Sequence, residues 1–394
     1  VPGYKFMPAF RNRMWDGKIR LYSQKTKEIY FGLFPYIRAF AEERGYNIVS
    51  EEGVEVNNKV DKDVVKKFSN SLGQKFEARD YQIDAIYHSL KFNRSLLLSP
   101  TASGKSFIIY SLIRYYTHLI KDAPNNRILL IVPTTSLVEQ MYSDFESYGW
   151  NVKKNCHRLY SGYSNQTDKK VLISTWQSLY KLPKEYFEQF GCVFGDEAHL
   201  FKSKSLTEIM TKLEDCKYRI GLTGTLDGAQ THKLVLEGLF GAVNKVTSTR
   251  KLMDKQQLSN LVVRCLILKH TVENSKMVTS GKYQDEIDYL VSSKSRQKFI
   301  RNLALKLKGN TLVLFQLVEK HGKNLHEIIK KKAESIGRGL RLGDNKVNAT
   351  LYDISDDLTY KSKENFTLKH FQERINIYTE EEFDYEMHNI DLKE

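Results

Sequence analysis

The sequence predicts an α/β fold built from parallel sheets flanked by helices. Between residues 76 and 250, short apolar runs alternate with longer segments whose apolar residues recur at helical spacing. A continuous apolar run such as residues 127–133 is typical of a parallel strand buried on both faces. The chain has 394 residues, and a chain of that length predicts about two to three domains.

The order of these patterns predicts a small N-terminal α+β domain followed by two lobes. We expect the N-terminal domain at residues 1–73, the first lobe at 74–250, the second lobe at 251–365 and a C-terminal helical extension at 366–394. Alternation of strands and helices gives a mostly parallel sheet with helices on both faces. The strands expected in the first lobe occupy residues 95–98, 127–133, 171–175, 192–195 and 218–223.

Basic and aromatic residues alternate near the N-terminus. Asp16 and Gly17 predict a hairpin turn between two short strands. Cations that interleave with aromatic rings suit phosphate contacts combined with base stacking. A hairpin with a basic solvent face and an aromatic core face is the alternative, and the residues alone leave both readings open. The candidate nucleic-acid contacts are Arg11, Arg13, Trp15, Lys18 and Arg20.

Charge and cysteine usage indicate a class of partner and a compartment. Lys and Arg number 61 against 47 Asp and Glu, which favours a polyanion such as nucleic acid over a merely soluble basic protein. The four cysteines include no C-x-x-C pair, so we expect reduced thiols in a cytoplasmic protein. No apolar run approaches the roughly 18 residues that span a bilayer, and the first residues show no signal-peptide pattern.

Residues 99–106, Ser-Pro-Thr-Ala-Ser-Gly-Lys-Ser, follow an apolar run and open a helical segment. This context predicts a phosphate-binding loop, although a polar strand-to-helix turn is the alternative. Gly104 lets backbone N–H groups turn inward, and the helix N-terminus adds partial positive charge. Lys105 is expected on the β- and γ-phosphates of ATP, and Ser106 on Mg²⁺. The remaining loop contacts are Thr101, Ala102 and Ser103, and Ser99 stands where the motif G-x-x-x-x-G-K-[ST] has its first glycine.

An acidic segment, Asp196-Glu197-Ala198-His199, ends a later apolar run. In a doubly wound sheet, the carboxyl ends of the strands face the ligand crevice. We therefore expect Asp196 to bind Mg²⁺ through water and Glu197 to orient and deprotonate the attacking water. His199 would sense the γ-phosphate or couple the site to neighbouring elements. A solvated acidic face is the alternative reading.

Three further segments are candidates for ligand contacts. Gln82 offers an amide that both donates and accepts hydrogen bonds, as the edge of adenine requires, and Tyr81 or Arg79 would stack on the base. Hydroxyls and N–H groups after the strands at 127–133 and 171–175 suit nucleic-acid phosphates, or act only as helix N-caps. The candidates at these two strand ends are Thr134, Thr135, Ser136, Thr175, Trp176 and Gln177.

In order and spacing, these segments resemble the motifs of superfamily 2 helicases. The region of Gln82 resembles the Q motif, residues 100–106 motif I, 133–140 motif Ia, 196–199 a DEAH-type motif II and 223–225 motif III. The runs at 4–22 and 368–385 are similar to the UvsW-type helicases of tailed bacteriophages. The resemblance implies two RecA-like lobes, a location in the host cytoplasm, and a motor for fork regression, branch migration and unwinding of DNA.

Residues 335–341 are similar to motif VI of the same family. The resemblance implies that Arg338 and Arg341, on the second lobe, stabilise the transferring phosphoryl group of ATP; a basic turn that binds nothing is the alternative. No strand–helix units separate the strand expected at 311–315 from this motif, whereas a complete α/β domain has about 100–150 residues. We therefore expect residues to be missing between Glu334 and Ser335, and the intact mass to exceed 45.9 kDa.

Together these features predict an ATP-dependent DNA helicase or translocase that uses ATP and Mg²⁺. We expect a monomer that holds single-stranded and branched DNA mainly through the backbone, with little sequence preference. An RNA-dependent ATPase and an ATP-regulated nucleic-acid binding or annealing protein are the alternatives. Stimulation by DNA or by RNA separates the polymers, and ATP-dependent strand displacement separates a motor from a binding protein.

Overall fold

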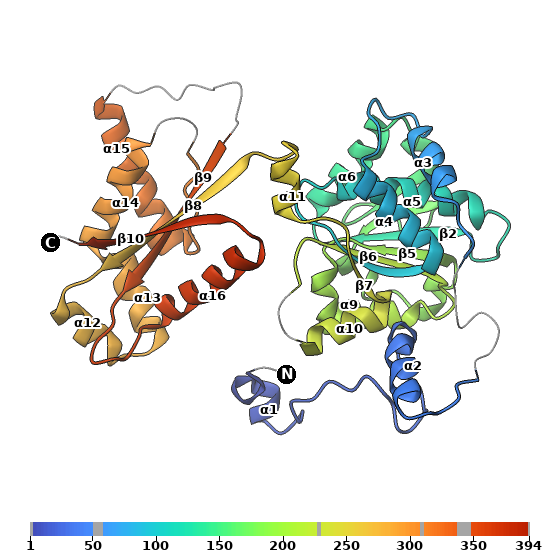
Figure 1. Ribbon diagram of the computed structural model, residues 1–394, viewed down its shortest axis with the longest axis horizontal. Coiled ribbons are helices and arrows are strands. Elements are labelled where there is room, and N and C mark those ends of the chain that lie inside the picture. Colours follow the sequence, from blue (N-terminus) through green and yellow to red (C-terminus); the bar gives the residue numbers. More distant parts are fainter. Residues whose placement is uncertain (1–2, 50–57, 227–229, 308–310, 337–347, 393–394) are drawn as a thin grey trace. The chain divides into compact units, whose positions relative to one another are not determined.

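The structure, a computed structural model, describes residues 3–49, 58–226, 230–307, 311–336 and 348–392. The chain divides into two compact units, Val1–Ser248 and Thr249–Glu394 (Figure 1). Within the described ranges, no helix is long and apolar enough to cross a membrane. The four cysteines are buried free thiols, as the expectation of reduced cysteines requires: Cys156, Cys192, Cys216 and Cys265.

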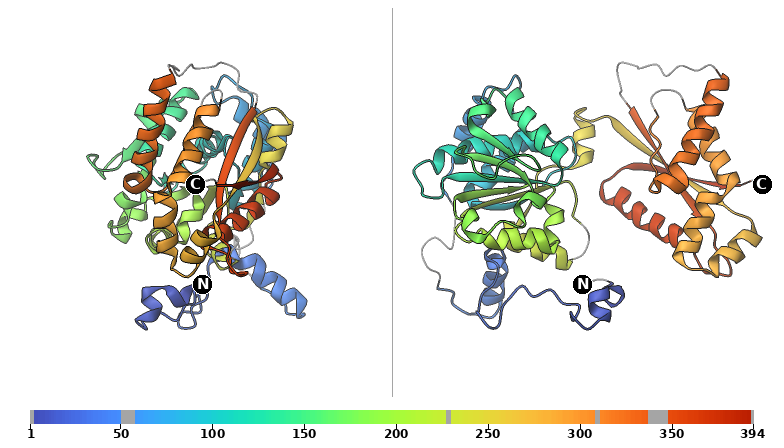
Figure 2. Two further views of the ribbon diagram at one scale, coloured as in Figure 1. Left: turned by 90° about the vertical axis from the view of Figure 1, so that its left-hand side faces the viewer. Right: turned by 180° about the vertical axis from the view of Figure 1, so that it is seen from behind.

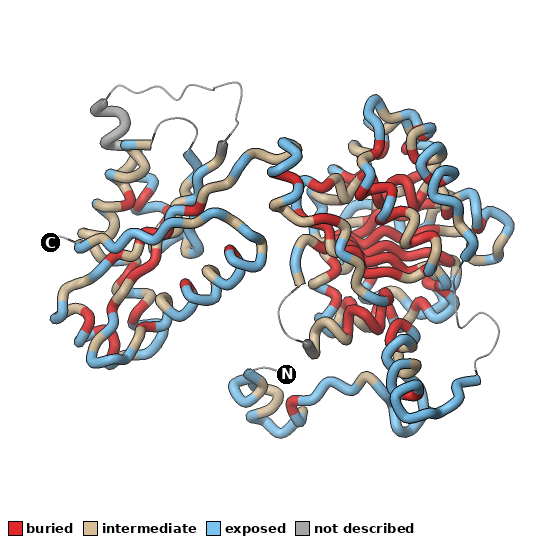
Figure 3. The backbone as a smooth tube through the Cα atoms, viewed as in Figure 1, coloured by how far each residue is buried: buried red, intermediate tan, exposed pale blue. Residues whose placement is uncertain are grey.

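The first unit is built on one parallel sheet. In its described part, seven strands lie in the order β3-β4-β2-β5-β6-β1-β7, and all neighbouring strands are parallel. The central strands are buried along almost their whole length (Figure 3), as the continuous apolar runs predict. Their bounds are β1 (Arg94–Leu98), β2 (Arg127–Val132), β3 (Cys156–Leu159), β4 (Val171–Thr175), β5 (Phe190–Gly195), β6 (Tyr218–Thr223) and β7 (Val243–Lys245).

Helices cover both faces of this sheet (Figures 1 and 2), and each face has its own apolar core. One core contains residues of α4, α5 and α6, and the other contains residues of α9 and α10. The long helices are α4 (Asp80–Phe92), α5 (Lys105–Leu119), α6 (Thr135–Ser147), α9 (Lys204–Lys212) and α10 (Gln230–Phe240). Helix α3 (Lys62–Asn70) is as long as α9, and the shorter helices are α7 (Val152–Asn155), α8 (Trp176–Leu179), η3 (Lys184–Phe187) and η4 (Ala198–Lys202).

Close packing at the end of β5 fixes where the acidic segment begins. A Cβ added to Gly195 would lie 2.8 Å from ring atoms of Phe201 and Phe240. A methyl group at that distance does not fit, so the glycine lets both rings reach the backbone of the strand. The backbone N–H of Asp196 donates to the carbonyl of Ile131 at 2.9 Å. Asp196 is therefore held in register with the neighbouring strand β2.

The N-terminal segment is part of the first unit and contains no strand within residues 3–49. The hairpin predicted around Asp16 is therefore wrong. Side chains close the turn instead, because the Asp16 carboxylate accepts from the backbone N–H of Lys18 and from Arg20, while Trp15 Nε1 donates to the Lys18 carbonyl. The elements here are η1 (Tyr4–Phe6), α1 (Pro8–Arg11), η2 (Phe31–Leu33) and α2 (Phe34–Glu43).

A buried carboxylate joins the N-terminal segment to α10. The Tyr36 hydroxyl donates to Glu237 Oε2 at 2.7 Å, and this hydrogen bond to the carboxylate raises the pKa of Tyr36 to about 12. A Cβ on Gly32 would lie 1.9 Å from the Glu237 carbonyl oxygen, so η2 approaches the α10 backbone directly. These contacts attach η2 and α2 to α10 within the first unit.

The second unit has a smaller parallel sheet. In the part that is described, three strands lie in the order β10-β8-β9. The helical extension predicted at 366–394 is a helix over Phe366–Glu380, but it is wrong for its last part, because Asp384–Asp391 form a strand that pairs with residues 262–269 of β8. The strands are β8 (Asn260–Lys269), β9 (Asn348–Asp357) and β10 (Asp384–Asp391), and the helices are α11 (Thr249–Asp254), α12 (Val272–Thr279), α13 (Tyr283–Ser292), α14 (Lys294–Lys306), η5 (Val318–Gly322), α15 (Lys323–Ile336) and α16 (Phe366–Glu380).

The strand predicted at 311–315 is also wrong. These residues belong to no strand, and the side chains of Leu312 and Leu314 are 82% and 79% exposed. An apolar run becomes a strand only when neighbouring strands take its backbone hydrogen bonds and its side chains. The three described strands pair with one another, and none of them pairs with this run.

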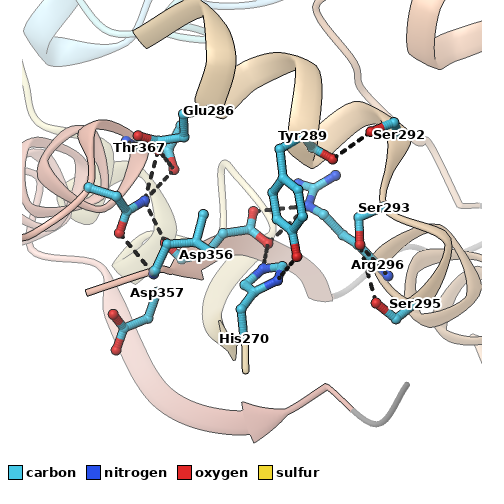
Figure 4. Close-up of polar contacts among 12 residues, drawn as sticks. His270, Glu286, Tyr289, Ser292, Ser293, Ser295, Arg296, Asp356, Asp357 and Thr367 are labelled. Carbon is cyan, nitrogen blue, oxygen red and sulfur yellow. Dashed lines mark hydrogen bonds and ion pairs between the residues drawn. The ribbon is translucent and has the colours of Figure 1, made fainter. Parts of the chain in front are cut away.

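Buried polar contacts hold the second unit together (Figure 4). Asp356, at the end of β9, accepts hydrogen bonds from Arg296 Nε at 2.9 and 3.0 Å and contacts His270 Nε2 at 3.0 Å. On α13, the Glu286 carboxylate accepts from the backbone N–H groups of Phe366 and Thr367, both at 2.8 Å. Glu286 therefore caps the N-terminus of α16, where a negative charge is favoured.

Candidate active site

The loop between β1 and α5 is tightly organised by its own side chains. Gly104 has φ of +80°, a left-handed conformation that favours glycine. The Ser103 hydroxyl lies 2.6 Å from the Ser99 hydroxyl and donates to the carbonyl of Pro100, also at 2.6 Å. Ser99, which replaces the first glycine of the motif, is therefore part of the hydrogen bonding that sets the shape of the loop.

Helix α4 holds the other side of this loop. Gln82 Nε2 donates to the carbonyl of Ser103 at 2.9 Å, and its Oε1 accepts from the backbone N–H of Arg79 at 2.9 Å. The Tyr81 hydroxyl donates to the same Ser103 carbonyl, and Arg79 donates to that hydroxyl. Both polar atoms of Gln82 therefore contact the protein in this structure, and the adenine contact expected of Gln82 and Arg79 stays a prediction.

The side chain of Gln82 also leaves no room for a side chain at position 104. A Cβ on Gly104 would lie 2.4 Å from Gln82 Nε2. The loop glycine and the α4 amide thus fit each other, and a side chain at position 104 would displace the amide or the loop. This contact accounts for the glycine independently of any bound phosphate.

Asp196 is the feature of the site that best fits a cation. The residue is 4% exposed, and its Oδ1 has no hydrogen-bond partner among the described residues. Burial raises the pKa of Asp196 to about 6, the charge of Glu197 adds to the rise, and Lys105 opposes it. A buried carboxylate oxygen without a partner costs free energy that a bound cation would recover, and hard cations such as Mg²⁺ take oxygen ligands.

Glu197 lies between a lysine and a histidine. Its Oε1 is 3.5 Å from Lys105 Nζ, and its Oε2 is 3.3 Å from His199 Nδ1. The backbone of Glu197 has φ of +49°, an uncommon left-handed conformation for a residue other than glycine that turns the chain sharply at the end of β5. His199 Nδ1 also lies 2.9 Å from the Thr223 hydroxyl, which donates to the carbonyl of Thr225.

The structure therefore brings together residues from three separate parts of the sequence. Lys105 follows β1, Asp196 and Glu197 follow β5, and Thr223 ends β6. Strands β5, β6 and β1 are consecutive in the sheet, so their carboxyl ends meet at one edge. Arg338 and Arg341 lie outside the described residues.

Sequence reasoning missed a tyrosine beside the loop. The hydroxyl of Tyr148, which follows α6, lies 2.9 Å from the hydroxyl of Ser106. The side chain of Asp144, on α6, also contacts Ser106, while burial raises the pKa of Asp144. Because 42 residues separate Ser106 from Tyr148, no local pattern in the sequence indicates this contact.

The predicted nucleic-acid contacts fall into two groups. Thr134 caps α6 at the carboxyl end of β2, with its hydroxyl accepting from the Leu137 N–H, and Thr175 ends β4 and is buried. Since β4 and β2 are neighbours, Thr134–Ser136 and Thr175–Gln177 share one edge of the sheet.

The second group surrounds a surface pocket of about 720 Å³ in the N-terminal segment. Arg11, Arg13 and Trp15 line this pocket. Arg20 lines it too but is paired with Asp16 at 2.6 Å, and Lys18 is absent from its lining. Both groups remain predicted DNA contacts. The pocket is lined by Lys5, Phe10, Arg11, Arg13, Met14, Trp15, Asp16 and Arg20.

A parallel sheet with a phosphate loop after β1 and adjacent carboxylates after β5 defines the class of helicase-like nucleotide-hydrolysing proteins. Comparison with known proteins agrees. Residues 75–228 match the family model of the type III restriction enzyme res subunit, and residues 1–51 match that of the N-terminal domain of the DNA helicase UvsW. The chain belongs to the UvsW family of DNA helicases, on the evidence of the following relatives.

The chain is 30% identical to the ATP-dependent DNA helicase uvsW of Enterobacteria phage T4, over 99% of this chain and 93% of the relative. Two crystal structures of T4 UvsW are similar. One covers all of this chain and 94% of its own at 27% identity and a TM-score of 0.57, and the other covers 62% and 88% at 33% identity and 0.56. The alignment with the phage T4 protein spans 474 positions, 80 more than the 394 residues of this chain.

Proposed function

We propose that this helicase hydrolyses ATP with Mg²⁺ to remodel branched DNA by fork regression, branch migration and unwinding. The observation that supports the proposal best is the buried, unpartnered oxygen of Asp196, on the same sheet edge as the loop that carries Lys105 and Ser106. Branched DNA as substrate rests on membership of the UvsW family. The basic surplus of +14 agrees with a polyanionic partner.

The ion pair between Lys105 and Glu197 suggests how nucleotide activates the site. Lys105 Nζ lies 3.5 Å from Glu197 Oε1, and phosphates bound by the loop would compete for the same ammonium group. When Lys105 turns to the phosphates, Glu197 loses its cation and becomes free to accept a proton from the attacking water. Mg²⁺ held by Asp196 and Ser106 would neutralise charge on the β- and γ-phosphates.

The arrangement of the sheet separates two tasks along one edge. The carboxyl ends of β5, β6 and β1 carry the proposed nucleotide contacts, and those of β4 and β2 carry the proposed DNA contacts. Strands β2 and β5 are neighbours, and the backbone hydrogen bond from Asp196 to Ile131 joins their ends. A shift of the backbone at the proposed nucleotide contacts would therefore also move the backbone at the proposed DNA contacts.

The proposal is tested by measuring ATP hydrolysis by the full chain with no polymer, single-stranded DNA, a branched junction and structured RNA. We expect strong stimulation by DNA, greatest with the junction, followed by ATP-dependent strand displacement. Stimulation by RNA alone would contradict the substrate, and hydrolysis without strand displacement would favour a nucleotide-regulated binding protein.

The role of Glu197 is tested by Glu197→Gln. The variant should bind ATP as the wild type does but turn it over about 10²–10⁴-fold more slowly, the usual contribution of a positioned general base. Binding is measured with a fluorescent nucleotide and turnover by phosphate release. Undiminished turnover would show that another group activates the water.

A further inference from the structure

The sheet order of the first unit extends the proposed DNA-binding edge by one strand. The DNA contacts proposed above follow β2 and β4, and β3 is the next strand outward. The loop that follows β3 begins at Tyr160 and therefore emerges at the same carboxyl edge. We propose that this loop presents a base-stacking surface for single-stranded DNA, centred on the ring of Tyr163. This inference rests on the proposed function.

The loop is held in one conformation by contacts at both of its sides. His157 Nε2 lies 2.7 Å from the carbonyl oxygen of Ser164. The Tyr186 hydroxyl donates to the carbonyl of Asn165 at 3.0 Å. Gly162 has φ of +95°, which supplies the tight bend before the tyrosine. A surface fixed in this way loses little conformational entropy when a ligand binds.

Tyr163 stands at the outer end of an aromatic and cationic cluster. Its ring centroid lies 4.7 Å from that of Tyr160, with the two planes at 63°. The guanidinium carbon of Arg158 lies 5.2 Å from the centroid of Tyr163 and 4.4 Å from that of Tyr142. Tyr163 is 38% exposed, so part of its ring remains accessible. Contacts with a cation and a second ring keep the exposed ring in place.

The charge of Arg158 is already balanced inside the cluster. Its guanidinium pairs with Glu139 Oε2 at 2.6 Å, and the Tyr160 hydroxyl donates to Glu139 Oε1, also at 2.6 Å. The hydrogen bond from Tyr160, with that from Arg158, lowers the pKa of Glu139 and keeps the carboxylate charged. The cluster therefore offers a neutral aromatic face, which suits a nucleobase rather than a phosphate group.

A stacking contact and a phosphate contact respond differently to salt. Loss of a phosphate contact reduces the dependence of affinity on salt concentration, whereas loss of a stacking ring lowers affinity and leaves that dependence unchanged. Tyr163→Ala should therefore bind a thymidine oligonucleotide about tenfold more weakly than the wild type, as expected for one stacked base. The slope of log affinity against log salt should not change.

Three controls make this test specific. Tyr163→Phe keeps the ring and should bind as the wild type does. Phe92→Ala removes a matched aromatic residue, which is 39% exposed, packs near His88 and precedes β1 at the opposite edge of the sheet; its affinity should not change. An oligonucleotide of abasic sites has no bases to stack, so on it Tyr163→Ala and the wild type should bind equally.

Fluorescence anisotropy with the full-length chain measures all of these affinities. Equal binding of the thymidine oligonucleotide by wild type and Tyr163→Ala would overturn the inference, and so would an equal loss on the abasic chain or a changed salt slope. ATP hydrolysis by the wild type separates this result from the proposed function. If the wild type shows DNA-stimulated hydrolysis but Tyr163→Ala binds normally, only the stacking surface fails. If Tyr163→Ala binds weakly but the wild type hydrolyses no ATP, only the helicase function fails.

Discussion

The two units of this protein both contain a parallel sheet, but different interactions stabilise each of them. The first buries a parallel sheet under helices on both faces, and its two apolar cores run through almost every strand. The second has a smaller sheet with small apolar clusters, one around Val263 and Phe371 and another around Leu290 and Leu358. Its elements are joined instead by buried carboxylates, Glu286 and Asp356.

The difference shows what each unit can tolerate. In the first unit, the stability of the sheet comes from apolar burial, so the polar residues at its carboxyl edge are free to serve a ligand. In the second unit, polar residues at comparable strand ends hold the fold. Substitution of strand-end residues should therefore cost activity in the first unit and stability in the second.

Lys105→Ala should have the largest effect and sharpens this contrast. Loss of the ammonium group removes an electrostatic contact to the phosphates, for which about 10³-fold in turnover is a reasonable magnitude. DNA affinity and melting temperature should stay close to those of the wild type, because Lys105 contacts the ligand site rather than the core. Phosphate release, anisotropy and calorimetry measure the three quantities, and a parallel loss of all three would indicate misfolding.

Asp356→Asn tests the opposite behaviour in the second unit. The neutral amide would leave the guanidinium of Arg296 buried without its carboxylate, and broken buried pairs of this kind cost about 3–5 kcal/mol. We expect that loss in the free energy of unfolding measured by denaturant titration. Asp357→Asn, at the adjacent and less buried position, is the matched control and should change stability little. If Asp356→Asn were as stable as Asp357→Asn and the wild type, the buried contacts of Asp356 would not contribute to stability.

The pH dependence of Mg²⁺ binding tests the electrostatics of Asp196. Its pKa of about 6 means that the carboxyl binds a proton before it binds a cation as pH falls. Apparent Mg²⁺ affinity should fall about tenfold for each pH unit below 6 and level off above it. Without Mg²⁺, the raised pKa means that Asp196 binds a proton more readily in the folded state than in the unfolded state, so its contribution to stability should fall as pH rises from about 4 to about 6. Asp196→Asn should weaken Mg²⁺ binding and remove this one contribution to the pH dependence of stability, as measured by calorimetric titration and thermal unfolding.

Leu314→Ser should have the smallest effect. Exposed positions usually change stability by less than about 0.5 kcal/mol, and Leu314 is 79% exposed. Thermal unfolding of the variant and of the wild type tests this, and a drop of several degrees in melting temperature would contradict the exposed position of Leu314.

Five strands of the first unit, β1, β2, β4, β5 and β6, could be predicted because each is buried along most of its length. Residues 171–175 and 218–223 match β4 and β6, and residues 127–133 match β2 to within one position. Strand β3 was not predicted, because this short edge strand contains His157 and Arg158 and shows no continuous apolar run. The strand predicted at 311–315 is wrong for the opposite reason, because this run has the apolar composition of a strand but pairs with none of the described strands.

Motifs in the sequence predict the residues of the proposed site, but they do not predict the contacts that hold those residues in place. Lys105, Asp196 and Glu197 were predicted from short segments because the strand–loop–helix context is local. The contact of Tyr148 with Ser106 and the second role of Gln82 as a support for the loop depend on tertiary packing, which spacing along the chain does not reveal.

The burial of the four thiols has a practical consequence for studying motion. Burial raises the pKa of Cys156 to about 12 and those of Cys216 and Cys265 to about 11, and only the thiolate attacks maleimide dyes readily. The native protein should therefore remain nearly unlabelled at neutral pH. One cysteine introduced at an exposed position in each unit would then be the sole pair of reactive thiols, and energy transfer between two attached dyes would follow the units through each round of ATP hydrolysis.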